Sequence, residues 1–269
     1  MIQISKEQFE RIVTAAATPT EGVYESMNVY FEDAMQRLTR ELLGDAVAQD
    51  LTSYPGLEDA IRKFVCLNGF YNAIPNLDLV LTETGFGVVS NQNLAPASAD
   101  RVQSLRTAVL DASGVVYEDC MYLLMGTDWS DTPQAIENIC SLVFSSHTLL
   151  HIGVHPQTRS KYLELRSDLL TCNDLLEQII SPELHDHLLE AIRHKTLNEK
   201  ETALCMICYR YIAFIIREKK PPLPFLINRI INYLHANLES FPDYQESSIY
   251  AARNIKPYEN KQEDSCYFF

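Results

Sequence analysis

Apolar side chains recur at steps of three and four residues over most of the chain, which is the spacing of one face of an amphipathic helix. The sequence therefore predicts a mainly α protein. In the first half the predicted helices span residues 5–17, 18–43 and 57–74, followed by a long helix capped by Ser98 or Asp100. In the second half they span residues 133–152 and 156–180, a short stretch capped by Ser181, and residues 198–217 and 225–238.

Residues 77–90 break this pattern, because their apolar positions alternate with a period of two. Leucines occupy every second position from Leu77 to Leu81, and Gly85 and Gly87 supply a turn before a second short strand. One β-hairpin is thus predicted in a helical chain. Because two isolated strands are marginal in water, the hairpin must pack on the helices or on another chain.

Turn-forming residues at 127–132, which include Trp129, predict a domain boundary. The expected organisation is an N-terminal helical lobe over 1–126, a C-terminal helical lobe over 133–239, and an extended or partly disordered tail over 240–269. The lobes also resemble a diverged internal repeat. Each has a long helix, a short helix and then an apolar helix closed by a proline segment.

The chain of 269 residues carries a formal net charge of −14, and such a surface repels phosphate backbones. We therefore expect no sequence-specific nucleic-acid partner. The only compact basic cluster in the sequence is Arg217, Lys219 and Lys220. It is interpreted as a helix end, where positive charge suits the negative pole of the helix dipole.

Most of the seven cysteines lie in apolar helical runs, which is typical of reduced, buried thiols in an intracellular protein. These are Cys66, Cys120, Cys140, Cys205 and Cys208. The N-terminus has no apolar core of signal-peptide length. No apolar run reaches the roughly 20 residues of a membrane span. The sequence therefore predicts a cytoplasmic protein without membrane association.

Two motifs have the spacing of metal or redox sites. His147, His151 and His155 are spaced by four, as metal ligands or a titrating cluster on one helix face would be. A glycine and a proline next to His155 favour a helix that ends before it, so surface or helix-end histidines are the preferred interpretation. Cys205 and Cys208 form a CxxC pair within an apolar helix and without a second pair, which favours two buried thiols.

For the other motifs, too, a structural role is a better explanation than a functional one. Gly85-Phe86-Gly87 is too short for a dinucleotide loop, and Ser98 lacks the setting of a nucleophile elbow. The sequence thus predicts no catalytic residue, no metal ligand, no cofactor and no small-molecule substrate. A protein that is not an enzyme is expected.

Residues 75–103 have a distinctive order of features. A proline is followed by a Leu-rich strand, a glycine turn, the runs Val-Val-Ser-Asn and Ala-Pro-Ala-Ser, and a helix that starts with Arg101-Val102-Gln103. This order resembles an uncharacterised protein family carried by phages and prophages of Bacteroides-type gut bacteria. Residues 162–181 also look like the second half of that family, and the resemblance covers the second helix to residue 239.

The resemblance implies a role in virion or tail assembly, as a small helical head-to-tail connector or adaptor. It supplies no catalytic residues to transfer. Such proteins oligomerise in rings, and an acidic surface would let DNA slide past. The implied partners are proteins of a phage particle or further copies of the chain, in the cytoplasm of the bacterial host or in the virion.

Two function classes remain open: a structural assembly protein, and a soluble helical interaction or regulatory protein without a virion role. In the first class, the hairpin and the tail are the expected contact elements. The alternative is that the hairpin covers its own helical core and the tail folds back on the same chain. The candidate contact residues are Phe86, Val88, Val89, Tyr250, Tyr258, Tyr267, Phe268 and Phe269.

Overall fold

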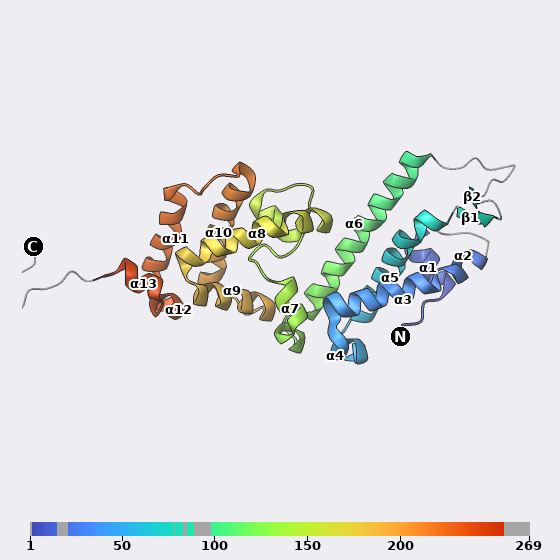
Figure 1. Ribbon diagram of the computed structural model, residues 1–269. Coiled ribbons are helices and arrows are strands. Elements are labelled where there is room, and N and C mark those ends of the chain that lie inside the picture. The colour runs from blue at the N-terminus through green and yellow to red at the C-terminus, as the bar shows by residue number, and fades with distance from the viewer. Residues whose placement is uncertain (1, 15–20, 78, 83–84, 89–97, 256–269) are drawn as a thin grey trace, which may run out of the picture. The chain divides into compact units, whose positions relative to one another are not determined.

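A computed structural model describes residues 2–14, 21–77, 79–82, 85–88 and 98–255 of the chain (Figure 1). The fold is mainly α, as predicted. The chain divides into two compact units, one formed by residues 1–166 with 192–196 and the other by residues 167–191 with 197–269.

The first unit consists of helices joined by short 3-10 and π-helical turns. Its helices are α1 (Lys6–Ile12), α2 (Glu21–Ser26), α3 (Asn28–Leu38), α4 (Gly44–Gln49), α5 (Leu57–Ala73), α6 (Ala99–Leu124), α7 (Pro133–Asn138) and the start of α8 (Arg159–Ile180). The turns are η2 (Thr39–Leu43), η3 (Leu51–Ser53), η4 (Ile74–Asn76), η5 (Asp128–Asp131) and η6 (His147–Ile152).

The predicted starts and stops of these helices explain much of the first unit. Ser5 and Gln8 form a capping box on α1, with the Gln8 amide nitrogen 3.2 Å from Ser5 Oγ. The predicted helix over 18–43 is instead divided into α2, α3 and the π-helical turn η2. This turn ends at Gly44, whose φ of 73° favours glycine.

Helix α5 is the centre of the first unit, and α3 and α6 run alongside it (Figure 1). It is buried over most of its length. A Cβ atom on Gly69 would lie 2.9 Å from Cδ1 of Phe31, so glycine is what permits the close approach of α3. The buried Asn68 amide lies 3.4 Å from Ser113 Oγ and links α5 to α6.

Two short strands follow α5, β1 (Leu79–Thr82) and β2 (Gly85–Val88). They pair antiparallel, with Leu79 opposite Val88 and Thr82 opposite Gly85. Both strands lie within the range of residues 77–90 given by the period-two pattern.

The predicted domain boundary at residues 127–132 is wrong, because this segment lies inside the first unit. Trp129 is fully buried, and its indole Nε1 donates a hydrogen bond of 2.7 Å to the carbonyl of Leu42. A cluster of turn-forming residues signals a break in helical structure, and here that break is a buried turn within one core.

The continuous helix predicted over 133–152 is also wrong. Helix α7 ends at Asn138, and a buried non-helical segment precedes η6. The hydroxyl of Thr148 accepts hydrogen bonds from the amides of Phe144 (3.0 Å) and Ser145 (2.9 Å). Serine and threonine side chains compete in this way with the backbone bonds of a helix, and the apolar spacing of the segment does not report that competition.

The second unit contains the rest of α8, most of α9 (Pro182–His194), α10 (Glu199–Glu218) and α11 (Pro224–Ala236). Helix α10 begins at a capping box formed by Asn198 and Glu201. Helices α10 and α11 pack against each other, and the buried side chains of α10 form much of the core of the second unit.

The tail predicted over residues 240–269 is folded over its first part. The chain continues as η7 (Leu238–Ser240), α12 (Pro242–Gln245) and α13 (Ser248–Arg253), with Phe241 and Tyr244 buried. Arg253 of α13 donates a hydrogen bond of 2.8 Å to the carbonyl of Gln178 at the end of α8. These helices are too short to produce a visible apolar period, and residues 256–269 lie outside the described residues.

None of the helices in the described ranges combines the length and the apolar character needed to cross a membrane.

Candidate functional site

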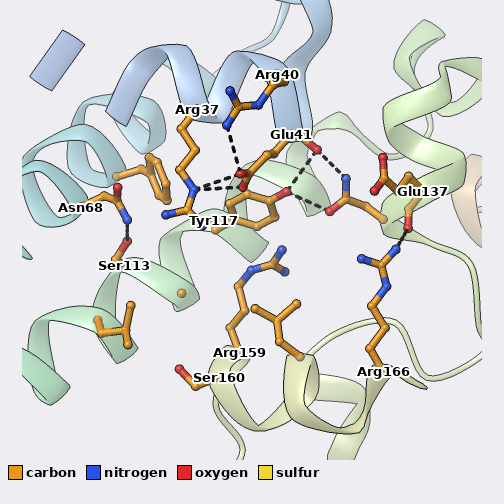
Figure 2. A pocket seen from close by; sticks show the side chains of 15 residues that line it. Arg37, Arg40, Glu41, Asn68, Ser113, Tyr117, Glu137, Arg159, Ser160 and Arg166 are labelled. Carbon is orange, nitrogen blue, oxygen red and sulfur yellow. Dashed lines mark hydrogen bonds and ion pairs between the residues drawn. The ribbon is translucent and has the colours of Figure 1, made fainter. Parts of the chain in front are cut away.

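The first unit contains a cavity of about 500 Å³ between the end of α3, η2, α5, α6, α7 and the start of α8 (Figure 2). We call it the arginine cavity, because four arginines line it: Arg37, Arg40, Arg159 and Arg166. Its volume is within the range of pockets that bind small molecules. The other charged residues that line it are Glu41 and Glu137, and its apolar wall contains Phe64, Leu110 and Leu163.

The end of η2 forms one side of the arginine cavity. The last carbonyls of a helix lack partners within it, and here side chains from other elements satisfy them. The Asn138 amide donates 2.8 Å to the carbonyl of Glu41, and Trp129 donates to Leu42. The hydroxyl of Tyr117 lies 2.9 Å from Asn138 Oδ1 and 3.3 Å from the Glu41 carbonyl. These bonds fix the Tyr117 ring at the cavity wall.

Two of the arginines, Arg37 at the end of α3 and Arg40 in η2, are paired with the carboxylate of Glu41 in η2. Arg37 Nε lies 3.0 Å and 3.2 Å from the two carboxylate oxygens of Glu41, and a nitrogen of Arg40 lies 3.7 Å from the same group. All three side chains are more than a third exposed, so these pairs add little stability. Their effect is to partly neutralise the positive charge on this side of the cavity.

Arg166 is held by the loop after α7. It donates 2.9 Å to the carbonyl of Glu137 and lies 3.8 Å from the sulfur of Cys140. Because a carbonyl is uncharged, this hydrogen bond does not neutralise the positive charge of the Arg166 guanidinium.

Arg159 lies at the first position of α8, with its side chain only 15% exposed. Its guanidinium lies over the ring of Tyr117, 3.6 Å from the ring centroid, in a cation–π contact. A Cβ atom on Gly114 would lie 2.8 Å from Cβ of Arg159, so the glycine in α6 permits the start of α8 to approach this closely.

Glu118, the residue after Tyr117, is buried next to the cavity with 4% exposure. Its carboxylate accepts hydrogen bonds from the amide (2.8 Å) and the hydroxyl (2.6 Å) of Ser146, and one oxygen lies 3.9 Å from Arg159. Burial raises the pKa of Glu118, while the bonds from Ser146 and the charge of Arg159 act in the opposite direction. The carboxylate thus orders the buried loop and supplies the nearest negative charge to Arg159.

The candidate contact residues predicted from the sequence lie elsewhere. Phe86 and Val88 belong to β2, and the positions of their side chains are not described. The others, apart from Tyr250, lie outside the described residues: Val89, Tyr258, Tyr267, Phe268 and Phe269.

Tyr250 is half-buried in α13 and packs within the second unit. Its ring centroid lies 5.4 Å from that of Tyr244 and 5.8 Å from that of His235, both in edge-on geometry. This packing of Tyr250 on its own chain agrees with the alternative in which the tail folds back on the same chain.

The three histidines spaced by four do not share one helix face. His147 and His151 lie in η6 with ring centroids 6.5 Å apart, and the turn ends at Gly153, before His155. Over the described ranges, no group of three or more His, Cys, Asp or Glu side chains could hold a metal ion.

The thiols predicted to be buried are confirmed as buried and free at Cys66, Cys120, Cys205 and Cys208. Burial raises the pKa of Cys205 to about 12, so this thiol of the CxxC pair is protonated at neutral pH. Cys140 differs from the prediction, since it is partly exposed in the loop after α7.

His185 is expected to make the stability of the second unit depend on pH. It is 2% exposed, neither ring nitrogen makes a hydrogen bond, and burial lowers its pKa below 6.5, with Asp186 and Asp174 opposing. Glu177 lies 3.3 Å from Nδ1, and burial raises its pKa. Below pH 6.5 the unfolded chain binds a proton at His185 that the folded chain does not. The free energy of unfolding therefore decreases as the pH is lowered, by up to about 1.4 kcal/mol per pH unit.

Urea unfolding of the wild type and of His185→Leu between pH 7.5 and 5 measures this effect. The variant should show a shallower decline in the free energy of unfolding as pH falls. His147→Leu, at an exposed position, is the control and should keep the wild-type slope. Equal slopes for all three proteins would mean that His185 does not contribute.

The sequence matches a family model described as a family of unknown function, DUF6712, over residues 26–138 and 224–254, more than half of the chain. The chain belongs to this family. The first matched segment contains η2, α5, α6 and α7 of the arginine cavity, and the second contains α11, α12 and α13. No curated protein and no solved structure gives a significant match.

The expectation of an uncharacterised family is thereby confirmed. Residues 162–181, which looked like the second half of the family, lie outside the matched segments, and so do Arg159 and Arg166. The second match extends to residue 254, beyond the limit of 239 expected from the sequence.

The arginine cavity was missed in the sequence. Its four arginines are separated by up to 129 positions, and the basic cluster visible in the sequence, Arg217 to Lys220, is not part of it. Gly114 within a long helix was the one local signal, because an interior glycine often marks a close approach.

Proposed function

We propose that the chain is a non-enzymatic structural protein of a phage particle, a head-to-tail connector or adaptor that works as an oligomer. It would be made in the cytoplasm of the bacterial host and assembled into the virion with protein partners. This proposal rests on the resemblance of residues 75–103 to a phage-carried family. The match to a family of unknown function covers the same residues and supports the resemblance at that level.

The hairpin and the end of the chain remain the proposed contact elements. Tyr250 is excluded from this set because it packs on Tyr244 and His235. The proposed contacts are therefore Phe86, Val88 and Val89 on the hairpin, and the aromatic residues within 256–269. A polar segment with aromatic side chains can become ordered when it binds a partner.

Deletion of residues 256–269 and the change Phe86→Asp, each in the phage or prophage that encodes the chain, test this proposal. The deletion retains α12 and α13, so it leaves the described fold of the second unit intact. Both mutants should produce fewer infectious particles, with the protein still present in the lysate. Lys63→Asp serves as the control for Phe86→Asp, because it introduces an aspartate at an exposed position that is not among the proposed contacts. Normal assembly and infection in both mutants would remove these segments as assembly contacts.

The second candidate is a helical interaction or regulatory protein without a role in the particle. The arginine cavity favours it, because a preformed cavity with several charged donors suits a protein whose contacts respond to a small ligand. Normal particle yield and infectivity after complete deletion of the gene would favour this candidate over the first.

A further inference from the structure

The arginine cavity has an excess of positive charge in a chain whose formal net charge is −14. Four guanidinium groups line it and two carboxylates, those of Glu41 and Glu137, accompany them. Both carboxylates belong to half-exposed or exposed side chains at the rim. The lining residues alone therefore carry two net positive charges, and the Glu118 carboxylate 3.9 Å from Arg159 offsets one of them when it is ionised. The remaining positive charge favours an anion.

Arg159 is the strongest single indication of a ligand. Its guanidinium has five N–H donors, yet within the described ranges it makes a ring contact with Tyr117 and a long ion pair with Glu118, and no hydrogen bond. The Arg159 side chain is part-buried, with 15% exposure, so the donors that these two contacts do not use remain open to a ligand in the cavity. Figure 2 shows the group between Tyr117 and the side of the cavity formed by Arg166.

The remaining wall suits a small organic molecule better than a bare ion. Ser113 and Ser160 add hydroxyl groups to the cavity, whereas Phe64, Leu110 and Leu163 add apolar surface. Arginine binds carboxylates and phosphates through two parallel hydrogen bonds, which a fixed guanidinium makes at low entropic cost.

We propose that the arginine cavity binds a small organic dianion, a phosphate monoester or a dicarboxylate, with the oxyanion on Arg159. Arg40 and Arg166 supply further positive charge at the rim. The apolar part of the ligand lies against Leu110 and Leu163. This site is independent of the proposed assembly role, which uses the hairpin and the end of the chain.

Isothermal titration calorimetry on the full chain at low ionic strength tests the proposal. The probes are phenyl phosphate, inorganic phosphate and succinate, and sodium chloride holds the ionic strength equal between them. At least one of the two organic dianions should bind with a Kd below about 1 mM and more tightly than inorganic phosphate. Tighter binding of phenyl phosphate identifies a phosphate monoester site, and tighter binding of succinate identifies a dicarboxylate site.

The variants Arg159→Gln and Arg101→Gln remove the same charge from different places. Arg101 is exposed on the first turn of α6, about 20 Å along that helix from Gly114. Arg159→Gln should weaken binding about tenfold or more, and Arg101→Gln by less than about twofold. Absence of binding by both organic dianions, or equal weakening in the two variants, would overturn the proposal.

Arg40→Gln keeps the test decisive if Arg159→Gln does not fold by circular dichroism. The Arg40 side chain is 76% exposed, so its replacement leaves the core unchanged. It should weaken binding about threefold or more through loss of rim charge. In that case, full affinity in Arg40→Gln contradicts the proposal.

Discussion

Replacing Trp129 by alanine is expected to lower the free energy of unfolding by about 3–5 kcal/mol. The side chain is fully buried in the first unit, so the change creates a large cavity. It also removes the indole donor from the carbonyl of Leu42, at a distance of 2.7 Å in the wild type. Because that carbonyl is at the end of η2, the loss should also loosen one side of the arginine cavity.

Trp129→Phe separates the two contributions, since phenylalanine retains most of the apolar volume and lacks the donor. This variant should lose less stability than Trp129→Ala. Urea unfolding followed by circular dichroism is the suitable measurement, because Trp129 is the chain's only tryptophan and the variants have no tryptophan fluorescence. A loss below about 1 kcal/mol for Trp129→Ala would contradict the position of Trp129 in the core.

Replacing Glu118 by alanine is expected to cost about 3 kcal/mol, because it breaks a buried charged network. The amide and hydroxyl of Ser146 lose their acceptor, and Arg159 loses the nearest carboxylate to its guanidinium. Glu118→Gln keeps an acceptor of the same shape and should cost less. If both variants are as stable as the wild type, the buried network does not support the fold.

The raised pKa of Glu118 adds a pH dependence to this prediction. Between its ordinary pKa and the raised value, the folded protein binds more protons at this site than the unfolded chain does. The contribution of Glu118 to stability is therefore complete at low pH and declines as pH rises through the raised pKa. The deficit of Glu118→Ala relative to the wild type should be larger at pH 5 than at pH 7, as measured by urea unfolding.

Local signals in the sequence identified most of the helices. The capping boxes at Ser5 and Asn198 and the breaks near Gly44 and Pro75 depend on nearby residues and on backbone geometry. These rules operate over a few positions, so one sequence is sufficient to apply them. The mainly α fold and the burial of most of the cysteines follow from the same patterns.

The errors came from interactions between distant residues. The loop after α7 was predicted as helix because its apolar spacing is helical, whereas Ser146 and Thr148 direct its backbone bonds to side chains. Trp129 was predicted in a linker because its partner, Leu42, is 87 positions away. The arginine cavity was missed for the same reason, and the internal repeat of the two lobes stays a prediction.

The proposed assembly role makes its most direct claim about the composition of a phage particle. Particles purified by density gradient from the phage or induced prophage that encodes the chain can be analysed by quantitative mass spectrometry, with the whole lysate alongside. The proposal predicts that the chain is present in the particles at a fixed ratio to the other virion proteins. Its presence in the lysate together with its absence from the particles would contradict the proposal.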